Sequence, residues 1–214
     1  MKNKIFKYTI TICATVFIIG LTFFQGEAQT ENNLIKKFNS SLNFEAEGDY
    51  KNALSELLSV YSQNKNHYLL NLRLGWVYYR LQDFEKSKVY YKTAVNINKQ
   101  SVEAMIAYTL PLSALELWGE VEDMYKAVLK LDEKNYTANL RLGQIFLYRG
   151  DYKFAKQYLE KVYNCNPGAY EPNISLGWTY FYLGEKEKAA ELFNNVLTIS
   201  PHDSLATLGI ESLK

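Results

Sequence analysis

The sequence predicts an all-α solenoid built from about five helix-turn-helix repeats of 34 residues, with a short capping helix at the C-terminus. The first observation is a 34-residue period that keeps its register from Leu34 to Asp203. The second is the pentapeptide Asn-Leu-Arg-Leu-Gly at 71–75, which recurs unchanged two periods later at 139–143. A fixed period near this length is typical of helical solenoids, in which each repeat buries its apolar face against its neighbours. The five repeats are expected at 34–67, 68–101, 102–135, 136–169 and 170–203.

The segment before the repeats, residues 1–28, has the layout of a secretory signal peptide. Three lysines give a positive start, an uncharged apolar run follows at 8–24, and small residues stand at the positions that signal peptidase reads, Gly26 and Ala28. We expect cleavage after Ala28 and a location in the periplasm or cell envelope. The alternative is an uncleaved anchor in the inner membrane, because the apolar run approaches the roughly 20 residues of a membrane span.

Residues 29–214 would form the mature chain, with a short lead at 29–33. This part keeps 21 Lys and Arg against 22 Asp and Glu, which gives a net charge of −1. Such a balance argues against a nucleic-acid partner, which needs concentrated positive charge. Cys165 is its only cysteine, so it can form no internal disulfide. One continuous domain, stabilised by apolar packing between repeats, is therefore expected.

Each repeat is expected to contain two antiparallel helices, A and B, which in the second repeat run from 68 to about 81 and from about 83 to 97. Gly-Asp and related pairs at positions 15 and 16 predict the turn between them, because Gly allows the left-handed conformation that ends a helix and Asp caps the next one. Small residues at positions 8 and 20 predict a close crossing of the two helices. Pro167 and Pro201, at position 32, are expected to end helix B.

The last segment, 204–214, predicts the capping helix. Asp203 or Ser204 is expected at its N-cap. Its three leucines, Leu205, Leu208 and Leu213, are expected to cover the exposed face of the fifth repeat, which has no further neighbour.

These features resemble the tetratricopeptide repeat family over 34–203. The family signature places Leu-Gly at positions 7 and 8, an aromatic at 11, Gly-Asp at 15 and 16, Ala at 20, an aromatic at 24 and Pro at 32. The fifth repeat carries it as Leu176, Gly177, Tyr180, Gly184, Ala189, Phe193 and Pro201, and the fourth as Leu142, Gly143, Phe146, Gly150, Asp151, Ala155 and Pro167. The third repeat departs most, and Pro111 inside its helix A predicts a kink near Ala107. The resemblance implies a right-handed superhelix.

The family places positions 2, 5, 6, 9, 12 and 13 of helix A on the concave surface. Here these positions combine aromatic and aliphatic side chains with arginines, the residue types that dominate binding hot spots. The candidate partner-binding residues are Leu72, Arg73, Trp76, Tyr79, Arg80, Arg141, Gln144, Tyr148, Trp178, Phe181 and Tyr182. The resemblance implies a groove for an extended or helical peptide with an acidic edge. The alternative is that these rings pack between successive A helices.

The sequence offers no catalytic or metal-binding arrangement, so we expect no enzymatic activity, no cofactor and no metal. The two histidines, His67 and His202, lie four repeats apart, and both are expected in turns. Cys165 is interpreted as a small core residue because other repeats carry aliphatic side chains at position 30. Trp118, at position 17, is also interpreted as core.

The predicted function is an exported, bacterial, non-catalytic scaffold that binds a protein or peptide and takes part in assembling a cell-envelope complex. This last step is an analogy with envelope members of the family. Two alternatives stay open. In one, the uncleaved N-terminal helix tethers the chain to the membrane. In the other, the solenoid self-associates through its C-terminal helix or its third repeat.

Overall fold

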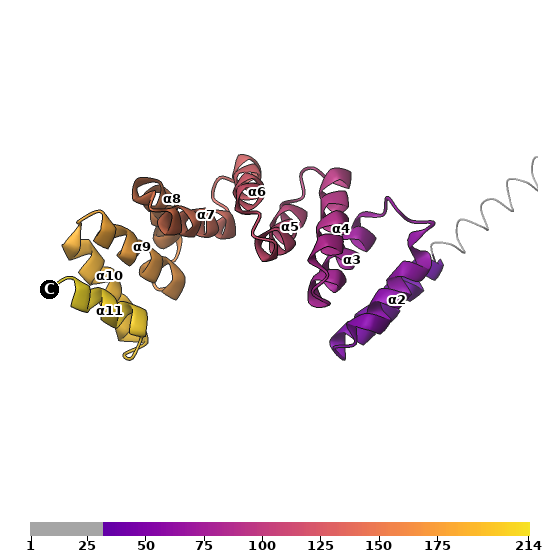
Figure 1. The fold of residues 1–214 in the computed structure, drawn as a ribbon, viewed down its shortest axis with the longest axis horizontal. Coiled ribbons are helices and arrows are strands. Elements are labelled where there is room, and N and C mark those ends of the chain that lie inside the picture. The colour runs from indigo at the N-terminus through magenta and orange to yellow at the C-terminus, as the bar shows by residue number, and fades with distance from the viewer. Residues whose placement is uncertain (1–31) are drawn as a thin grey trace, which may run out of the picture. The chain divides into compact units, whose positions relative to one another are not determined.

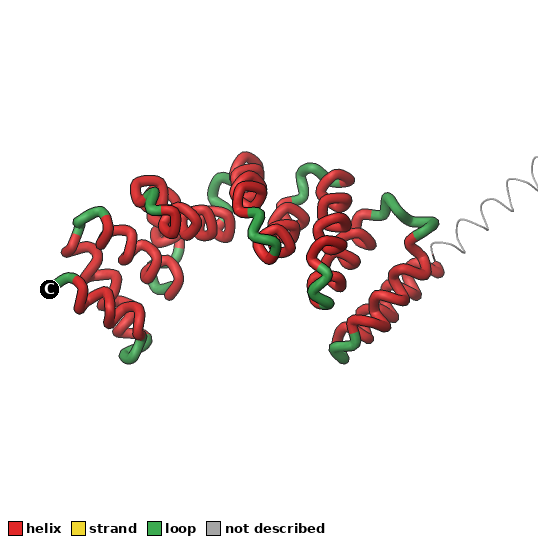
Figure 2. Tube along the Cα trace, in the orientation of Figure 1, coloured by secondary structure: helices red, strands yellow, loops and turns green. Residues whose placement is uncertain are grey.

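The structure is a computed structural model that describes residues 32–214, and the predicted signal peptide at 1–28 lies outside the described residues. Every regular element in 32–214 is a helix, and short turns join the helices (Figure 1, Figure 2). A helical segment at 32–46 precedes ten labelled helices. These are α2 (Tyr50–Tyr61), α3 (Tyr68–Arg80), α4 (Phe84–Ile97), α5 (Val102–Ala114), α6 (Trp118–Leu131), α7 (Tyr136–Arg149), α8 (Tyr152–Cys165), α9 (Tyr170–Tyr182), α10 (Lys186–Ile199) and α11 (Ser204–Ser212). The predicted all-α repeat fold is confirmed.

The helices keep the 34-residue phase of the sequence. Helices α3, α5, α7, α9 and α11 all begin at position 1 of the period, and α2, α4, α6, α8 and α10 all begin at position 17. Helix α11 therefore starts where helix A of a further repeat would start. Within 32–214, no helix is both long enough and apolar enough to cross a bilayer.

The chain divides into two compact units, an N-terminal unit that ends at Ile97 and a C-terminal unit from Asn98 to Lys214. In the N-terminal unit, the segment 32–46 packs with α2 and α3 around buried aliphatic residues that include Leu34, Leu57 and Leu70. In the C-terminal unit, each helix contacts the next one along the chain. The A-type helices also contact each other there, α7 with α9 and α9 with α11.

Helices A and B approach closely at position 8, as its small residues predict. A Cβ atom added to Gly177 on α9 would lie 2.8 Å from the Phe193 ring on α10, closer than such atoms approach in real structures. The third repeat has Thr109 in place of glycine, and the Thr109 hydroxyl lies 3.0 Å from the Tyr125 hydroxyl. A buried hydrogen bond thus replaces a glycine contact in the repeat that departs most from the family signature.

The turn between helices A and B has one geometry throughout. Position 15 is left-handed in all five repeats, at Gly48, Gln82, Glu116, Gly150 and Gly184. The third repeat therefore forms the standard turn without the Gly-Asp pair, at the steric cost that a non-glycine residue has in this conformation. Helix α5 continues through the proline at position 10 of this repeat to Ala114, and the kink near Ala107 stays a prediction.

The N-caps of the A helices show a regularity of which the sequence analysis predicted only the Asp203 cap. At position 34, the side chains of His67, Ser101, Asn135 and Asp203 each accept a hydrogen bond from the backbone N–H three residues later. Such a bond satisfies one of the free N–H groups at the start of a helix. His67 is thus a helix cap, since its Nδ1 accepts from the Leu70 N–H at 3.2 Å. Ala169 holds the equivalent place before α9 and makes no such bond.

Replacing Ala169 with Asn is expected to raise the free energy of unfolding by about 1 kcal/mol, because the new side chain can cap α9 as Asn135 caps α7. The reciprocal change, Asn135→Ala, should lower it by a similar amount. Urea denaturation followed by circular dichroism measures both changes. A midpoint that moves in the same direction for the two variants would contradict the capping role.

Two residues that were predicted to be core are exposed. Trp118 is 50% exposed, and Cys165 is an exposed free cysteine. The reason is their place in helix B, since position 17 is its first residue and position 30 its last. Position 30 is also exposed at Ile97, Leu131 and Ile199. A recurring apolar residue at a helix end therefore does not indicate burial here.

The packing face of α11 also differs from the prediction. Asp203 caps the helix, as expected, by accepting from the Ala206 N–H at 2.8 Å. Ala206 and Gly209 are buried against the fifth repeat, whereas Leu205 and Leu208 are 48% and 52% exposed. The register explains the burial of Ala206, because position 3 is buried in every A-type helix from α3 to α11, whereas Gly209 is buried by the Phe193 ring that lies against it. Positions 2 and 5 lie on the face that carries the candidate groove residues.

Candidate functional site

Four helices of the C-terminal unit line a hollow of about 340 Å³. Its walls are aromatic and aliphatic, with the Ser175 hydroxyl and the tyrosine hydroxyls as their polar groups. The lining residues are Leu147 and Tyr148 of α7, Tyr152 of α8, Ile174, Ser175, Trp178 and Tyr182 of α9, and Leu205 of α11. An apolar hollow with a few polar groups is the usual form of a site that binds a ligand or a side chain.

Contacts with neighbouring aromatic rings fix the positions of two lining residues, Trp178 and Tyr182. Trp178 meets Phe193 edge to face at 5.2 Å and Phe181 at 5.4 Å. Tyr182 stacks on Tyr152, with ring centres 4.6 Å apart and planes 11° from parallel. Such contacts fix the orientation of each ring before a partner arrives, which lowers the entropy cost of binding.

Tyr148 differs from the other rings of the hollow because 90% of its surface is exposed. It lies in the last turn of α7, at the edge of the hollow. A large aromatic that is almost fully exposed contributes little to the fold and leaves apolar surface in water. Tyr148 is therefore the lining residue whose role is easiest to separate from stability.

Arg141 and Gln144, two further candidates, connect helices instead of lining the hollow. The Arg141 guanidinium donates to Gln144 at 2.8 Å and to the Glu171 carboxylate at 3.2 Å. The Gln144 amide donates in turn to the Ser175 hydroxyl at 3.3 Å. These bonds join α7 to α9. The Arg141–Glu171 pair is half-exposed, and exposed pairs contribute at most about 1 kcal/mol.

The candidates of the N-terminal unit form a separate cluster on α3. Trp76 and Tyr79 stack with ring centres 6.2 Å apart, and the Arg80 guanidinium lies 5.1 Å from the Trp76 ring and 4.4 Å from the Tyr50 ring. Leu72, one turn earlier on the same helix, is half-buried.

Arg73 in this cluster already has an acidic partner. Its Nε lies 2.6 Å from Oε1 of Glu45, whose side chain is only 5% exposed. Arg80 is likewise engaged with two rings. Arg73 and Arg80 thus both make contacts within their own unit, and their binding to an acidic edge of a partner stays a prediction.

The structure thus brings three of the predicted residues into one hollow, Tyr148, Trp178 and Tyr182, and places Phe181 against the last two rings at 5.4 and 5.3 Å. The sequence reading missed Tyr152 and Leu205 as lining residues. An aromatic residue recurs at position 17, and this recurrence could have identified Tyr152 as a lining residue. Position 17 had instead been interpreted as core, from Trp118.

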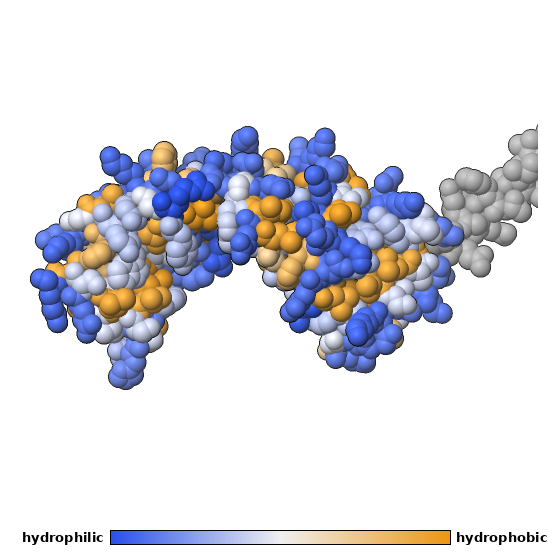
Figure 3. All heavy atoms as spheres, viewed as in Figure 1, coloured by the Kyte–Doolittle hydropathy of each residue, from blue (hydrophilic) through white to orange (hydrophobic). Residues whose placement is uncertain are grey.

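Hydrophobic surface gathers on the visible face of the C-terminal unit over α9 and α11 (Figure 3). The exposed leucines of α11, Leu205 and Leu208, lie on the helix face that extends the hollow. Clustered apolar surface of this kind is a mark of interaction sites, whereas single exposed residues are not.

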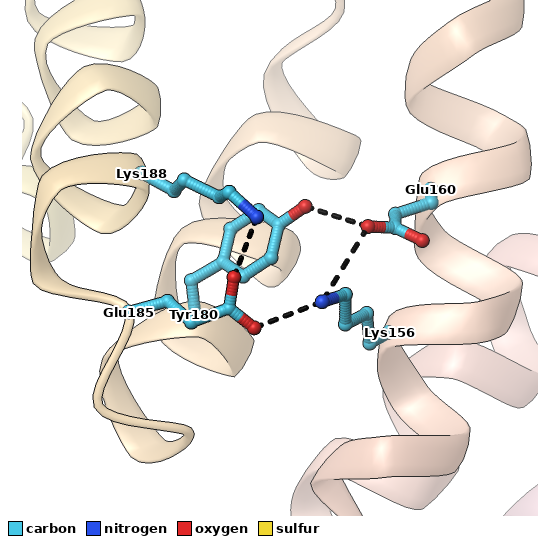
Figure 4. A network of polar contacts seen from close by, with 5 residues as sticks. All are labelled: Lys156, Glu160, Tyr180, Glu185 and Lys188. Atoms are coloured by element: carbon cyan, nitrogen blue, oxygen red, sulfur yellow. Dashed lines mark hydrogen bonds and ion pairs between the residues drawn. The ribbon is translucent and has the colours of Figure 1, made fainter.

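A polar network joins the fourth repeat to the fifth (Figure 4). The Tyr180 hydroxyl donates to Glu160 at 2.7 Å. Lys156 lies 2.8 Å from the Glu185 carboxylate, and Lys188 lies 2.6 Å from it. Both ammonium groups also lie about 5 Å from the centre of the Tyr180 ring, at 5.2 and 5.0 Å. The network therefore connects α8 to both helices of the next repeat.

The network shifts the titration of its members. Hydrogen bonds from Lys156 and then Lys188 hold the pKa of Glu185 below its usual range. Burial, followed by the hydrogen bond to Glu160, raises the pKa of Tyr180. Each shift favours the protonation state that keeps the network intact at neutral pH.

We expect the network to lose its contribution to stability in acid. Because the folded-state pKa of Glu185 is depressed, its contribution is present above the unfolded pKa and disappears as pH falls through the folded value. Glu185→Gln should therefore unfold more easily than the native chain at pH 7 and show a smaller difference below about pH 4. Thermal unfolding across this pH range measures the effect. Glu191→Gln, an exposed change outside the network and beyond the first turn of α10, is the control and should show no pH-dependent difference.

Within 32–214, no group of three or more His, Cys, Asp or Glu side chains is placed to hold a metal ion. The architecture that the described residues define is a helical repeat protein with an aromatic hollow at the C-terminal end of its helix array.

Comparison with known proteins finds tetratricopeptide repeats in this chain. The model of the family described as Tetratricopeptide repeat matches residues 69–101, 136–168 and 170–203. A curated relative, BBSome complex member BBS4 of Bos taurus, is 28% identical over 123 residues, which cover 58% of this chain and 24% of the relative. The present chain thus spans about a quarter of that protein.

Two solved structures share the fold. A tetratricopeptide repeat protein from Parabacteroides merdae superimposes with a TM-score of 0.76 at 16% identity, covering 85% of this chain and 72% of that one. YrrB, described as a TPR protein with an unusual peptide-binding site, gives a TM-score of 0.72 at 18% identity and covers 88% and 97% of the two chains. Three segments of the chain thus match the tetratricopeptide repeat, and the chain shares the fold of solved tetratricopeptide repeat proteins.

Proposed function

We propose that this chain is a non-catalytic protein-interaction scaffold that binds an apolar or aromatic segment of a partner peptide in the hollow of its C-terminal unit. The observation that carries the proposal is the hollow of about 340 Å³ itself, with its preorganised rings and the almost fully exposed Tyr148 at its edge. Peptide binding by YrrB, stated in the description of that structure, supports the same class of ligand.

The chemistry of the lining selects the ligand. Aromatic rings and leucines gain free energy from removing apolar surface from water. The lining contains no charged residue, so a charged side chain would lose its hydration there without gaining an ion pair. The preferred ligand is therefore a peptide with one or two large apolar side chains, and the Ser175 and tyrosine hydroxyls are available to its backbone.

We further propose that the scaffold is exported and takes part in assembling a complex of a bacterial cell envelope. The support is the signal-like segment at 1–28 together with the resemblance to envelope members of the family. The mass of the protein isolated from its source organism tests export, since cleavage after Ala28 removes residues 1–28. A full-length protein recovered from the membrane fraction would favour the tethered alternative.

The binding test uses peptides selected by display against the full chain. Selected peptides are expected to be rich in aromatic and aliphatic residues, and Tyr148→Ala should weaken their binding by about tenfold, in line with an exposed aromatic hot spot. Its exposure means that helical content and unfolding midpoint should not change.

Trp118→Ala is the matched control, because Trp118 is an exposed aromatic of the same unit that lies outside the hollow. Peptide affinity should be equal for this variant and the native chain. The proposed site would be contradicted if Tyr148→Ala also bound the peptides with the affinity of the native chain. It would also be contradicted if charged residues dominated the selected peptides.

A further inference from the structure

The fourth repeat has a second hollow, which lies away from the aromatic one. It measures about 290 Å³ and lies between the end of α8, the start of α7 and the turn that precedes α7. Its lining residues are Glu133, Lys134, Tyr136, Asn139, Lys161, Val162 and Cys165. Position 30 holds Cys165 here, where the second, third and fifth repeats hold the longer side chains of Ile97, Leu131 and Ile199. The short side chain is one reason that this space is open.

Asn139 in this hollow has a buried amide oxygen that lacks a donor. The residue is 1% exposed, and its amide nitrogen donates to the backbone carbonyls of Glu133 at 3.0 Å and Asn135 at 2.9 Å. Its Oδ1 has no hydrogen-bond partner among the residues that the structure describes. Buried acceptors are almost always satisfied, so an exception indicates a missing donor.

The other two asparagines at position 4 show what such a donor is. Asn71 Oδ1 accepts from the Tyr61 hydroxyl, and Asn173 Oδ1 accepts from the Asn195 amide, both at 3.3 Å. In the fourth repeat, Lys161 takes the place of Asn195. Its ammonium group is turned to the Glu133 carboxylate, 3.1 Å away.

Cys165 adds a reactive group to the same hollow. Its thiol is free and exposed, and two ammonium groups, those of Lys134 and Lys161, line the hollow with it. Glu133 is the one acidic residue of this lining and pairs with Lys161, so one cation is left in excess beside an exposed thiol, and such thiols exchange with disulfides. The lysines would also attract a carboxylate on an incoming molecule.

We propose that this hollow is a modification site at which Cys165 forms a mixed disulfide with a small acidic thiol compound that carries an amide N–H. The Cys165 thiol loses its proton to solvent. The resulting thiolate attacks one sulfur of the small compound, which is present as a disulfide. The sulfur–sulfur bond of that compound breaks, a new one forms to Cys165, and the other half leaves as a thiolate. One disulfide replaces another, so no further oxidant is needed. Lys134 and Lys161 hold the carboxylate, and Asn139 Oδ1 accepts from the amide N–H.

The test treats the full chain with oxidised glutathione, which has carboxylates and amides, and separately with cystamine, which has neither. Peptide mass spectrometry measures the rate at Cys165, and the same chain in urea supplies the intrinsic rate ratio of the two reagents. In the folded chain, this ratio should favour oxidised glutathione by at least about tenfold over the ratio in urea. Equal ratios in the folded and unfolded chain would overturn the proposal.

Lys161→Asn is the decisive variant, because it introduces the residue that the fifth repeat has at this position and that donates to the equivalent asparagine there. It removes one cation and supplies Asn139 with an internal donor, and it should abolish most of the preference for oxidised glutathione while the unfolding midpoint is kept or raised. Lys153→Asn, an exposed change on the same helix outside the hollow, should leave the preference intact. A preference that survives Lys161→Asn would show that the exposed thiol alone determines the reaction, against the proposal.

Discussion

Replacing Phe193 with Ala is expected to lower the free energy of unfolding by about 3–5 kcal/mol, the largest effect of any single change considered for this chain. The ring is fully buried. Its two edges meet the backbone of Gly177 on α9 and of Gly209 on α11, where an added Cβ would lie 2.8 and 2.4 Å away. Three helices therefore close around one side chain, and their backbones cannot collapse into the cavity that Ala would leave. Urea denaturation followed by circular dichroism measures the loss.

Phe154→Ala is the control for this prediction, because it removes the same side chain from an exposed site on α8. Its effect should be about 1 kcal/mol, because the ring is half-exposed and contacts the Phe146 ring at 5.5 Å. Phe193→Leu should give an intermediate loss and keeps the test informative if the Ala variant does not fold. Similar losses for Phe154→Ala and Phe193→Ala would contradict the central role of Phe193.

Gly143→Ala is expected to destabilise the fourth repeat by about 1–2 kcal/mol, although alanine is the better helix former by about 1 kcal/mol. The added Cβ would lie 2.5 Å from Cγ of Leu159 on the facing helix. Leu159 is fully buried and cannot turn away into solvent. The helices must separate to relieve the contact, and this disturbs the packing around them.

A double-mutant cycle with Leu159→Ala tests this explanation. Removing the leucine removes the clash, so the double variant should be more stable than the sum of the two single effects predicts. Gly168→Ala serves as a second reference, since a Cβ there meets nothing within 4 Å. Simple additivity in the cycle would rule out the contact as the cause.

The fold was predictable because its signals are periodic. A small residue stands at position 8 of all five repeats, as Gly177 does in the fifth, and each recurrence reinforces the same interpretation of helix, turn and crossing. The caps of the A helices, apart from the Asp203 cap, were not predicted, because their residue types do not recur. Four different residue types, including His67, perform one role at position 34, so no single letter marks it.

The site was predictable only in part. The repeat pattern indicates on which face of a helix a residue lies, but not which side chains that residue contacts. Trp178 and Tyr182, two of the predicted partner-binding residues, line the aromatic hollow. The pairing of Arg73 with Glu45 could not be foreseen, because it depends on which side chain of the preceding helix reaches it. Exposure at helix ends, as for Trp118, depends likewise on where the adjacent helix stops.

Because corresponding helices from α2 to α11 start at the same position of the repeat, equivalent residues of different repeats can be compared within this one chain. Any position occurs several times in an equivalent backbone setting, so a substitution can copy the residue that another repeat already tolerates there. Lys161→Asn and Ala169→Asn are changes of this kind, and neither asks the backbone to adopt a new conformation. If a measured property differs between two equivalent positions, the side chain and not the backbone causes the difference. Residues selected for binding can then be distinguished from residues selected for folding within a single molecule.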